Sequence, residues 1–151
     1  MGEISLLAFA DKMNEIMPTI IKEFARRQIN ELYKGKITLP QFLILDFLQK
    51  QGEVKMTALA NFMNVTTAAM TGIVDRLVRD HYVVRVFDPK DRRIIKIKPT
   101  AKGRELVKKV NQQRREMIIK IFGRLSQTDR QDYLRILLQI LEILNKKESN
   151  I

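Results

Sequence analysis

The chain changes sharply in character near its middle. Nineteen consecutive residues, from Met56 to Val74, carry no charge (MTALANFMNVTTAAMTGIV). The twenty residues from Arg85 to Arg104 (RVFDPKDRRIIKIKPTAKGR) then hold eight Lys or Arg and two Asp, a net charge of +6. The uncharged stretch contains four Thr, two Asn and one Gly, which is too polar for a membrane span. The contrast therefore predicts an uncharged pair of helices followed by a cationic segment.

The uncharged stretch has the signals of two short helices. Thr57 is expected to cap the first, which ends at Met63. Asn64 is expected at the tight turn, because Asn tolerates a positive φ better than most residues. Thr66 is expected to cap the second helix, from Thr67 to about Asp80. The buried stripe of that second helix is expected to be Met70, Ile73, Val74 and Leu77.

The basic run has the signals of a β-hairpin. Val83–Phe87 is rich in β-branched and aromatic residues and predicts a strand. Asp88–Asp91 has Asp and Pro at the first two positions of a type I turn. Ile95–Lys98 alternates with period two and predicts the returning strand. Two helices followed by a hairpin with a basic tip are typical of a winged helix-turn-helix.

Helical signals also precede this region. Apolar residues recur at helical spacing from Ser5 to about Tyr33, and Lys34–Lys36 ends the element. Pro18 must either kink one long helix or open a second, because proline removes a backbone donor. From Thr38 the sequence TLPQ has the pattern of a capping box with Pro in the first turn, so a helix begins there. Gly52 is its expected end.

Two more helices are expected after the hairpin. Thr100 caps one that runs to about Leu125, and Ser126 opens the last, which runs to about Lys146. The middle of that last helix, Ile136–Leu144 (ILLQILEIL), is apolar on more than one face. A single core does not absorb so wide an apolar surface, so we expect part of it to contact a partner chain.

Composition narrows the function. The net charge of +11 favours an anionic partner, nucleic acid first and an anionic membrane surface second. With no Cys and one His, disulfides, zinc sites and thiol-based redox sensing are excluded, and we expect no cofactor. No Gly-rich phosphate loop, nucleophile elbow or HExxH motif is present, which disfavours an enzyme. Because no secretory signal opens the chain, a cytoplasmic protein is expected.

Two segments together resemble the MarR family of bacterial and archaeal transcription regulators. Thr57–Arg85 (TALANFMNVTTAAMTGIVDRLVRDHYVVR) is similar to the helix-turn-helix of the family, including Val-Asp-Arg-Leu at Val74–Leu77. Asp88–Gly103 (DPKDRRIIKIKPTAKG) is similar to the wing, including Asp91 and Arg93 and the Thr-x-x-Gly at its end. Both segments at this separation are a specific match.

The resemblance extends from about Leu39 to Leu144 and implies one domain, mainly α with a small β-hairpin wing. Residues 38–103 would form the winged helix-turn-helix, and residues 1–37 and 104–151 the dimerisation helices. It further implies a homodimer that sets two wings on a near-palindromic operator in double-stranded DNA, usually as a repressor. In some members a small aromatic or phenolic ligand loosens DNA binding from a cleft between the two parts.

Three departures from the family pattern matter. His81 stands where Gly usually follows the recognition helix, and His adopts a positive φ at some cost. Pro99 replaces the apolar residue that usually ends the second wing strand, which we expect to shorten that strand. Cysteine is missing, so the peroxide and oxidant sensors of the family are not models for this chain.

The expected DNA contacts follow from the fold. Helix-turn-helix proteins place the N-terminal residues of the second helix at base edges in the major groove. Here none of those residues can make a bidentate pair with guanine or adenine, so hydroxyl, methyl and phosphate contacts are expected instead. We expect Arg93 to reach the minor groove, and Asp91 to hold an Arg by a charge-assisted hydrogen bond. The predicted DNA-contacting residues are Thr66, Thr67, Ala68, Thr71, Gly72, Arg76, Lys90, Arg92 and Arg93.

Plainer explanations stay open. Thr66 can serve only as a helix cap, and the basic turn can be an ordinary solvated turn. Arg76 and Arg79 favour the macrodipole near the end of their helix and can pair locally with an Asp; for Arg79 the two explanations weigh equally. For the whole protein, the main alternative to a regulated repressor is a winged-helix architectural or interaction module without ligand control.

Overall fold

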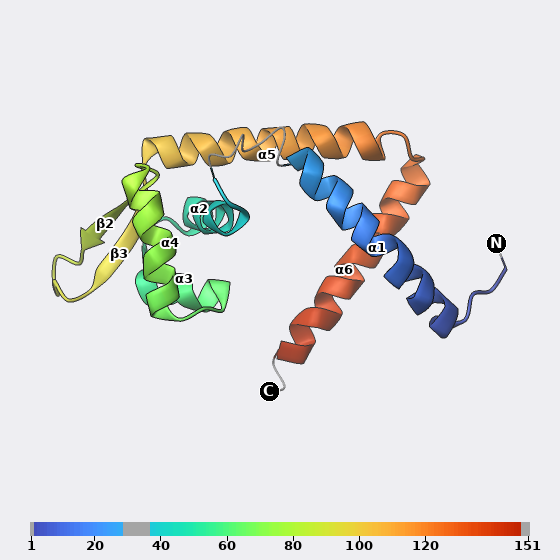
Figure 1. Cartoon of the computed structure of the whole chain (residues 1–151), viewed down its shortest axis with the longest axis horizontal. Helices are drawn as coiled ribbons and strands as arrows, with labels where there is room; N and C mark the ends of the chain where they lie inside the picture. Colours follow the sequence, from blue (N-terminus) through green and yellow to red (C-terminus); the bar gives the residue numbers. More distant parts are fainter. Residues whose placement is uncertain (1, 29–36, 149–151) are drawn as a thin grey trace. The chain divides into compact units, whose positions relative to one another are not determined.

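The computed structural model describes residues 2–28 and 37–148. It divides into two compact units, Met1–Gln113 and Arg114–Ile151. The architecture is mainly α with one small antiparallel sheet, as expected from the sequence (Figure 1). One helix, α5 (Ala101–Phe122), contributes to both units.

The winged helix-turn-helix lies in the first unit. Its elements in chain order are α2 (Leu39–Gln51), β1 (Val54–Lys55), α3 (Met56–Met63), α4 (Thr67–Arg79), β2 (Val83–Phe87) and β3 (Ile95–Pro99). The strand order is β1-β3-β2, so β3 is the central strand. The sequence predicted the hairpin of β2 and β3, but not the two-residue strand β1 that completes the sheet.

The capping signals around α2 are confirmed. The Thr38 hydroxyl accepts a hydrogen bond from the Gln41 backbone N–H (3.4 Å), and the Gln41 side chain accepts one from the Thr38 backbone N–H (2.9 Å). At the other end Gly52 has φ +79°, a value that glycine adopts without steric cost. These two ends fix the length of α2.

The helix-turn-helix turn is confirmed at Asn64, which has φ +51°. The predicted cap at Thr57 is wrong: α3 already begins at Met56, and its N-cap Lys55 makes no side-chain capping bond. The reason is β1. Val54 pairs with Ile97 and Lys55 with Lys96, so the chain leaves the sheet directly into the helix.

The two wing strands pair over five residues, from Val83 opposite Pro99 to Phe87 opposite Ile95. The expectation that Pro99 shortens the second strand is wrong, because β3 includes it. The ladder continues at this end through the Thr100 backbone N–H, which donates to the Tyr82 carbonyl (3.0 Å). The missing donor of Pro99 therefore does not end the pairing.

The core of this unit gathers apolar side chains from every element of the winged fold. Phe42, Leu45 and Leu48 of α2 are fully buried with Leu59 of α3 and Ile97 of β3. The helix α4 contributes Met70, Val74 and Leu77, and α5 contributes Val107 and Val110. The predicted buried stripe of α4 is confirmed at Met70, Val74 and Leu77, and Ile73 is partly buried against the core.

The junction between α4, the sheet and α5 depends on close backbone packing. His81 follows the end of α4 and has φ +63°, so the residue that replaces Gly in the family pattern adopts the left-handed conformation. The Thr100 hydroxyl donates to the His81 carbonyl (2.7 Å) and accepts from the Gly103 N–H (3.1 Å), which confirms Thr100 as the cap of α5. A Cβ on Gly103 would overlap the Tyr82 carbonyl oxygen. The Thr-x-x-Gly motif is therefore a packing requirement.

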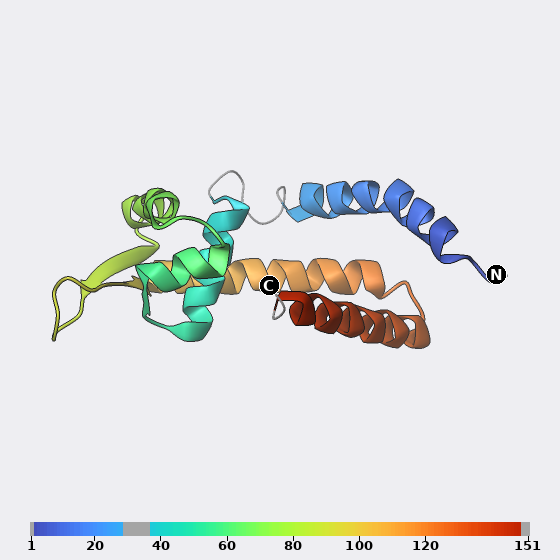
Figure 2. The ribbon, with the colours of Figure 1, turned by 90° about the horizontal axis from the view of Figure 1, so that it is seen from below.

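The flanking helices are α1 (Leu6–Gln28) and α6 (Gln127–Glu148). Pro18 lies inside α1 and opens no second helix, and Figure 2 shows that α1 bends along its length. Its expected continuation to Tyr33 and the Lys34–Lys36 end lie outside the described residues. Among the described residues, no helix is long and apolar enough to cross a membrane.

We predict that Gly103→Ala destabilises the protein by about 1–3 kcal/mol, because a methyl group there forces the Tyr82 backbone away from α5. Gly72→Ala is the matched control. A Cβ on Gly72 meets nothing within 4 Å, so that variant should gain about 0.5–1 kcal/mol from helix propensity. Urea denaturation of both variants measures the difference, and equal stability would contradict the packing role of Gly103.

Candidate nucleic-acid interface

The candidate recognition helix α4 is held by one face. Met70, Val74 and Leu77 are buried, so the opposite face is turned outward. The helix begins at Thr66, whose hydroxyl accepts a hydrogen bond from the Ala69 backbone N–H (3.1 Å). The cap and the buried stripe together present the N-terminal half of the outward face as small and uncharged.

The predicted contact residues on this face differ in the freedom of their polar groups. Thr67, Ala68 and Gly72 are exposed, while Thr71 is half-buried. The Thr71 hydroxyl donates to the Thr67 carbonyl (2.9 Å), which leaves its oxygen as an acceptor. The Thr67 hydroxyl has no partner in the described part of the chain and can donate outward.

The two Arg residues near the end of α4 are not equivalent. Arg79 pairs with Asp80 (Nε to Oδ1, 3.1 Å), and this hydrogen bond holds the pKa of Asp80 below its ordinary value. Arg76 makes no ion pair with any residue in 2–28 or 37–148. Of the two, Arg76 is the cation that is available to an external anion.

A carboxylate on the outward face of α4 is neutralised from the wing. Asp75 accepts a hydrogen bond from Arg85 of β2, ten residues later in the chain. Arg85 is half-buried, so its guanidinium spans from the sheet to the helix. This pair joins α4 to the wing. From the sequence, Arg76 and Arg79 were expected to be the local partners of an Asp, and the pairing of Asp75 with Arg85 was not predicted.

The wing tip, residues 88–94, is organised by Asp88. Its Oδ1 accepts the backbone N–H groups of Lys90 (2.8 Å) and Asp91 (3.2 Å), and its Oδ2 pairs with Lys96 (3.2 Å). The two backbone bonds and Lys96 lower the pKa of Asp88, and Asp88 in turn raises the pKa of Lys96. The Asp88 N–H closes the loop onto the Ile94 carbonyl (3.0 Å). The sequence predicted Asp88 as the first residue of the turn, but it did not predict the ion pair with Lys96.

Asp91 and Arg93 form a two-point contact at the tip. The Arg93 Nε donates to Asp91 Oδ1 (3.1 Å), the Nη2 donates to Oδ2 (3.4 Å), and the Arg93 backbone N–H donates to Oδ1 (3.0 Å). The Arg93 side chain is nevertheless 91% exposed. The guanidinium is therefore fixed in direction while it stays open to solvent.

Two side-chain hydrogen-bonded pairs thus join members of the predicted set, Asp91 with Arg93 and Thr71 with Thr67. Lys90 and Arg92 are exposed beside Arg93 and have no ion-pair partner in the described residues. The N-terminal half of the outward face of α4 is thus small and uncharged, and the wing tip is cationic. Both lie in one compact unit, and the Asp75–Arg85 pair connects the helix to the wing.

Comparisons with known proteins fit this geometry. Residues 37–95 match the model of the MarR family. The HTH-type transcriptional regulator YpoP of Bacillus subtilis is 30% identical over 135 residues, which cover 89% of this chain and 92% of YpoP. The chain belongs to the MarR family. It is therefore an HTH-type transcriptional regulator, from a class of DNA-binding proteins and not of enzymes.

Further relatives of this MarR-family chain include the HTH-type transcriptional repressor YetL of Bacillus subtilis. YetL is 37% identical over 101 residues, covering 67% of this chain and 55% of YetL. A MarR-family protein from Bacillus stearothermophilus has the same fold, with a TM-score of 0.82 at 22% identity over 94% of this chain and 99% of that chain. The transcriptional regulator BldR from Sulfolobus solfataricus matches with a TM-score of 0.63 at 29% identity, over 96% and 95%.

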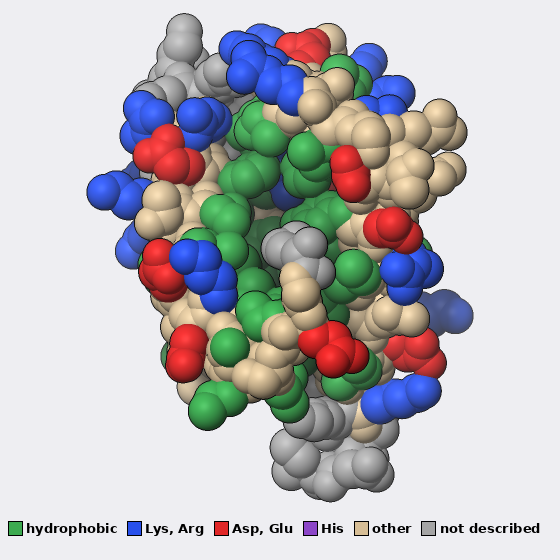
Figure 3. Space-filling model, turned by 90° about the vertical axis from the view of Figure 1, so that its right-hand side faces the viewer, with side chains coloured by type: hydrophobic (Ala, Val, Ile, Leu, Met, Phe, Trp, Pro, Cys, Tyr) green, Lys and Arg blue, Asp and Glu red, His purple; other side chains and the backbone are tan. Residues whose placement is uncertain are grey.

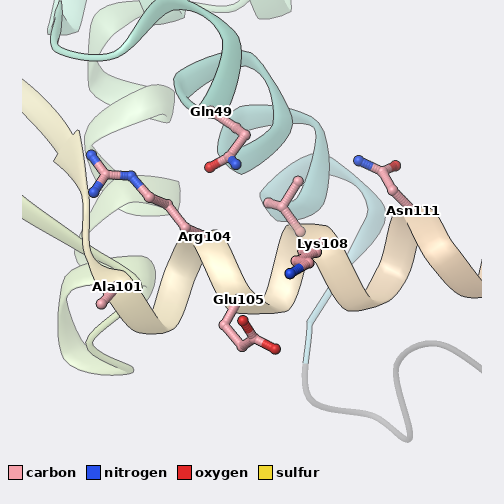
Figure 4. Close-up of a pocket in the computed structure, with 7 residues that line it drawn as sticks. Gln49, Ala101, Arg104, Glu105, Lys108 and Asn111 are labelled. Atoms are coloured by element: carbon pink, nitrogen blue, oxygen red, sulfur yellow. The ribbon is translucent and has the colours of Figure 1, made fainter.

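This MarR-family chain also has an open pocket of about 490 Å³ between α2 and α5. Its lining residues are Gln49, Ala101, Arg104, Glu105, Val107, Lys108 and Asn111. Figure 4 shows Gln49 on α2 facing α5, with Glu105 on the far side of α5. Arg104 and Lys108 lie one turn apart and have no ion-pair partner in the described residues. The pocket therefore has two basic side chains and one acidic side chain in its lining, and the lining includes no aromatic side chain.

Proposed function

We propose that this chain is a cytoplasmic repressor that binds a near-palindromic site in double-stranded DNA as a homodimer, and that a small aromatic or phenolic ligand releases it. One observation carries the DNA-binding mode. The N-terminal half of the exposed face of α4 is small and uncharged, and the adjoining wing ends in Lys90, Arg92 and Arg93, whose side chain is hydrogen-bonded to Asp91. Such a surface suits a helix that lies close to the bases in the major groove, while the cations of the wing contact the DNA backbone.

Gly72 supports a close approach of α4 to the groove. Glycine inside a helix costs about 0.5–1 kcal/mol relative to alanine, and the packing of this protein does not require it, because a Cβ there meets nothing within 4 Å. The helix nevertheless keeps Gly72 on its outward face, beside Ala68 and Thr71. An absent side chain at this position lets the helix backbone lie deeper in the major groove.

In this binding mode, few side chains form hydrogen bonds with the base edges. Thr66, Thr67 and Thr71 offer single hydroxyls, and one of these already donates within the helix. Phosphate contacts by Arg76, Lys90 and Arg92 then supply most of the affinity. Arg93 enters the minor groove, where A·T pairs narrow the groove and raise its negative potential. Asp91 reduces the loss of side-chain conformational entropy when Arg93 binds, because it already holds the guanidinium in one direction.

We predict that Arg93→Ala weakens DNA binding about ten- to a hundredfold and makes the dependence of log affinity on log salt shallower by about one unit per wing. The parent protein should lose about 10³–10⁵ in affinity between 50 and 200 mM salt. Fluorescence anisotropy with a bound duplex measures both quantities. Lys109→Ala, an exposed cation on α5, is the charge-matched control. Unchanged affinity of the Arg93 variant would remove Arg93 from the interface.

The homodimer is supported by apolar surface that the described chain leaves uncovered. Leu134, Leu138 and Leu141 lie on one face of α6, while Ile136 and Ile140 lie on another. In α1 the exposed large apolar residues are Leu6, Leu7, Phe9, Ile16, Met17, Ile20 and Ile21. Figure 3 shows hydrophobic side chains uncovered among charged ones on the face that it draws. Apolar surface of this extent is typical of a protein–protein interface.

We predict that light scattering at micromolar concentration gives twice the chain mass of 17.7 kDa. Leu141→Glu should shift the protein toward monomer, because it places a charge in the buried contact. Gln139→Glu adds the same charge to the same helix at a polar position and should leave the mass unchanged. A monomeric parent protein would contradict the dimer.

Ligand release is supported by the pocket between α2 and α5. Its volume lies within the usual range for small-molecule sites. Arg104 and Lys108 favour an acidic group on the ligand, so a phenolic or aromatic acid fits better than a neutral aromatic compound. Asn111 beside them is tied to α2 through Asp46 (3.2 Å), which places the pocket next to a contact between the two helices.

We predict that selection of bound duplexes from a random library enriches a near-palindromic sequence, and that adding a phenolic acid lowers the recovery of that sequence. Arg104→Ala should abolish the effect of the acid but keep the sequence preference. Enrichment of no sequence would favour the alternative, an architectural module that binds DNA without ligand control. If a preferred sequence is enriched but no phenolic acid changes its recovery, the proposed repressor function stands and the proposed phenolic ligand is wrong.

A further inference from the structure

Two large apolar side chains lie opposite each other near the wing tip. Phe87 of β2 pairs in register with Ile95 of β3, and their exposed fractions are 59% and 36%. Alternation along the strands puts them on the same sheet face as Ile97, which is fully buried. The apolar face of the sheet therefore continues outward beyond the edge of the core.

This face turns toward α4. Arg85, two residues before Phe87 and on the same sheet face, reaches Asp75 on the outward side of that helix. Beyond Phe87 and Ile95 the chain enters the wing tip, with Arg93 extended into solvent. The apolar pair thus lies between the contact that joins helix to wing and the cation at the tip.

The surroundings of the pair favour a polyanion as its occupant. Lys90, Arg92 and Arg93 follow Phe87 within six residues and are all exposed, whereas the acidic residues of the tip, Asp88 and Asp91, are half-buried. A partner that satisfies both the cations and the apolar pair must carry negative charge beside non-polar surface. The sugar–phosphate backbone of DNA has both, since each phosphate is flanked by the C–H faces of deoxyribose.

We propose that Phe87 and Ile95 pack on the deoxyribose rings of the DNA strand that passes between α4 and the wing tip. This inference rests on the proposed function. A helix in the major groove and a wing tip in the adjacent minor groove have one backbone strand between them. The cations hold its phosphates, and the apolar pair covers its sugars.

The proposed contact with the sugars can be distinguished from an electrostatic contact by its dependence on salt and on DNA sequence. Removing a cation reduces the number of counterions released on binding and makes the salt dependence shallower, whereas removing an apolar contact leaves that slope unchanged. Because every nucleotide carries the same sugar, the loss should also be equal for all duplex sequences. Phe87→Ala should therefore lower affinity by about tenfold per wing at every salt concentration, on preferred and random duplexes alike.

The experiment measures affinity by fluorescence anisotropy from 50 to 300 mM salt for Phe87→Ala, Phe87→Leu and Val84→Ala. Leucine keeps apolar contact and should retain most of the affinity. Val84 is 43% exposed on the opposite sheet face of β2, so its truncation should have no effect. Thermal unfolding of each variant reports whether the fold is intact.

Three results would overturn the inference: no loss for Phe87→Ala, an equal loss for Val84→Ala, or a loss confined to one duplex sequence, which would indicate insertion between particular bases. Arg93→Ala keeps the two proposals distinguishable. If Arg93→Ala weakens binding and Phe87→Ala does not, the sugar contact fails and the proposed function stands. If the parent protein binds no duplex, the proposed function itself fails.

Discussion

The close approach of the first turn of α5 to the backbone at Tyr82 is the contact on which the rest of the winged unit depends. Four elements meet there, because α4 ends, β2 begins, β3 ends and α5 begins within a few residues of it. Thr100 bonds the backbone on both sides, and Lys102 donates to the Asp80 carbonyl (2.9 Å) while its ammonium lies over the Tyr82 ring (4.7 Å). The absence of a side chain at Gly103 allows this spacing. The direction in which α4 leaves the core and the direction in which the hairpin leaves it are both set here.

The acidic residues of this basic surface mostly serve geometry. Asp88 folds the tip around its carboxylate, Asp91 fixes Arg93, and Asp75 ties Arg85 to α4. Each carboxylate lies against a cation or backbone donors. Its negative charge is therefore largely neutralised toward an approaching phosphate. Exposed pairs of this kind add little to folding stability. Their effect is to reduce the number of orientations in which the cations meet a ligand.

Local signals predicted most of the fold. The capping box at Thr38, the left-handed Asn64 and the caps at Thr66, Thr100 and Ser126 all follow from short-range chemistry. The predictions that failed concern features that depend on strand pairing between residues distant in the sequence. The strand β1 has two residues and no periodic pattern, so only its partner β3 reveals it, and its presence moved the start of α3 from the predicted Thr57 cap.

The same limit applies to the candidate site. The exposure of the α4 face and of the wing tip could be expected from the sequence, and so could a carboxylate beside Arg93. The Asp75–Arg85 and Asp88–Lys96 pairs could not, because each joins residues whose distance is set by the sheet register. In α5, Val107 and Val110 are buried in the core, whereas Leu106 is only partly buried, and this difference depends on which side of the helix the rest of the fold covers.

Gly72 illustrates how stability and binding can place opposite demands on one position. A methyl group there has space and would suit the helix, so a search for more heat-resistant variants would readily accept alanine. Under the proposed binding mode, that gain would move the helix axis outward by the thickness of a methyl group. Selection for stability alone would then favour a variant that keeps the same fold but loses affinity for DNA.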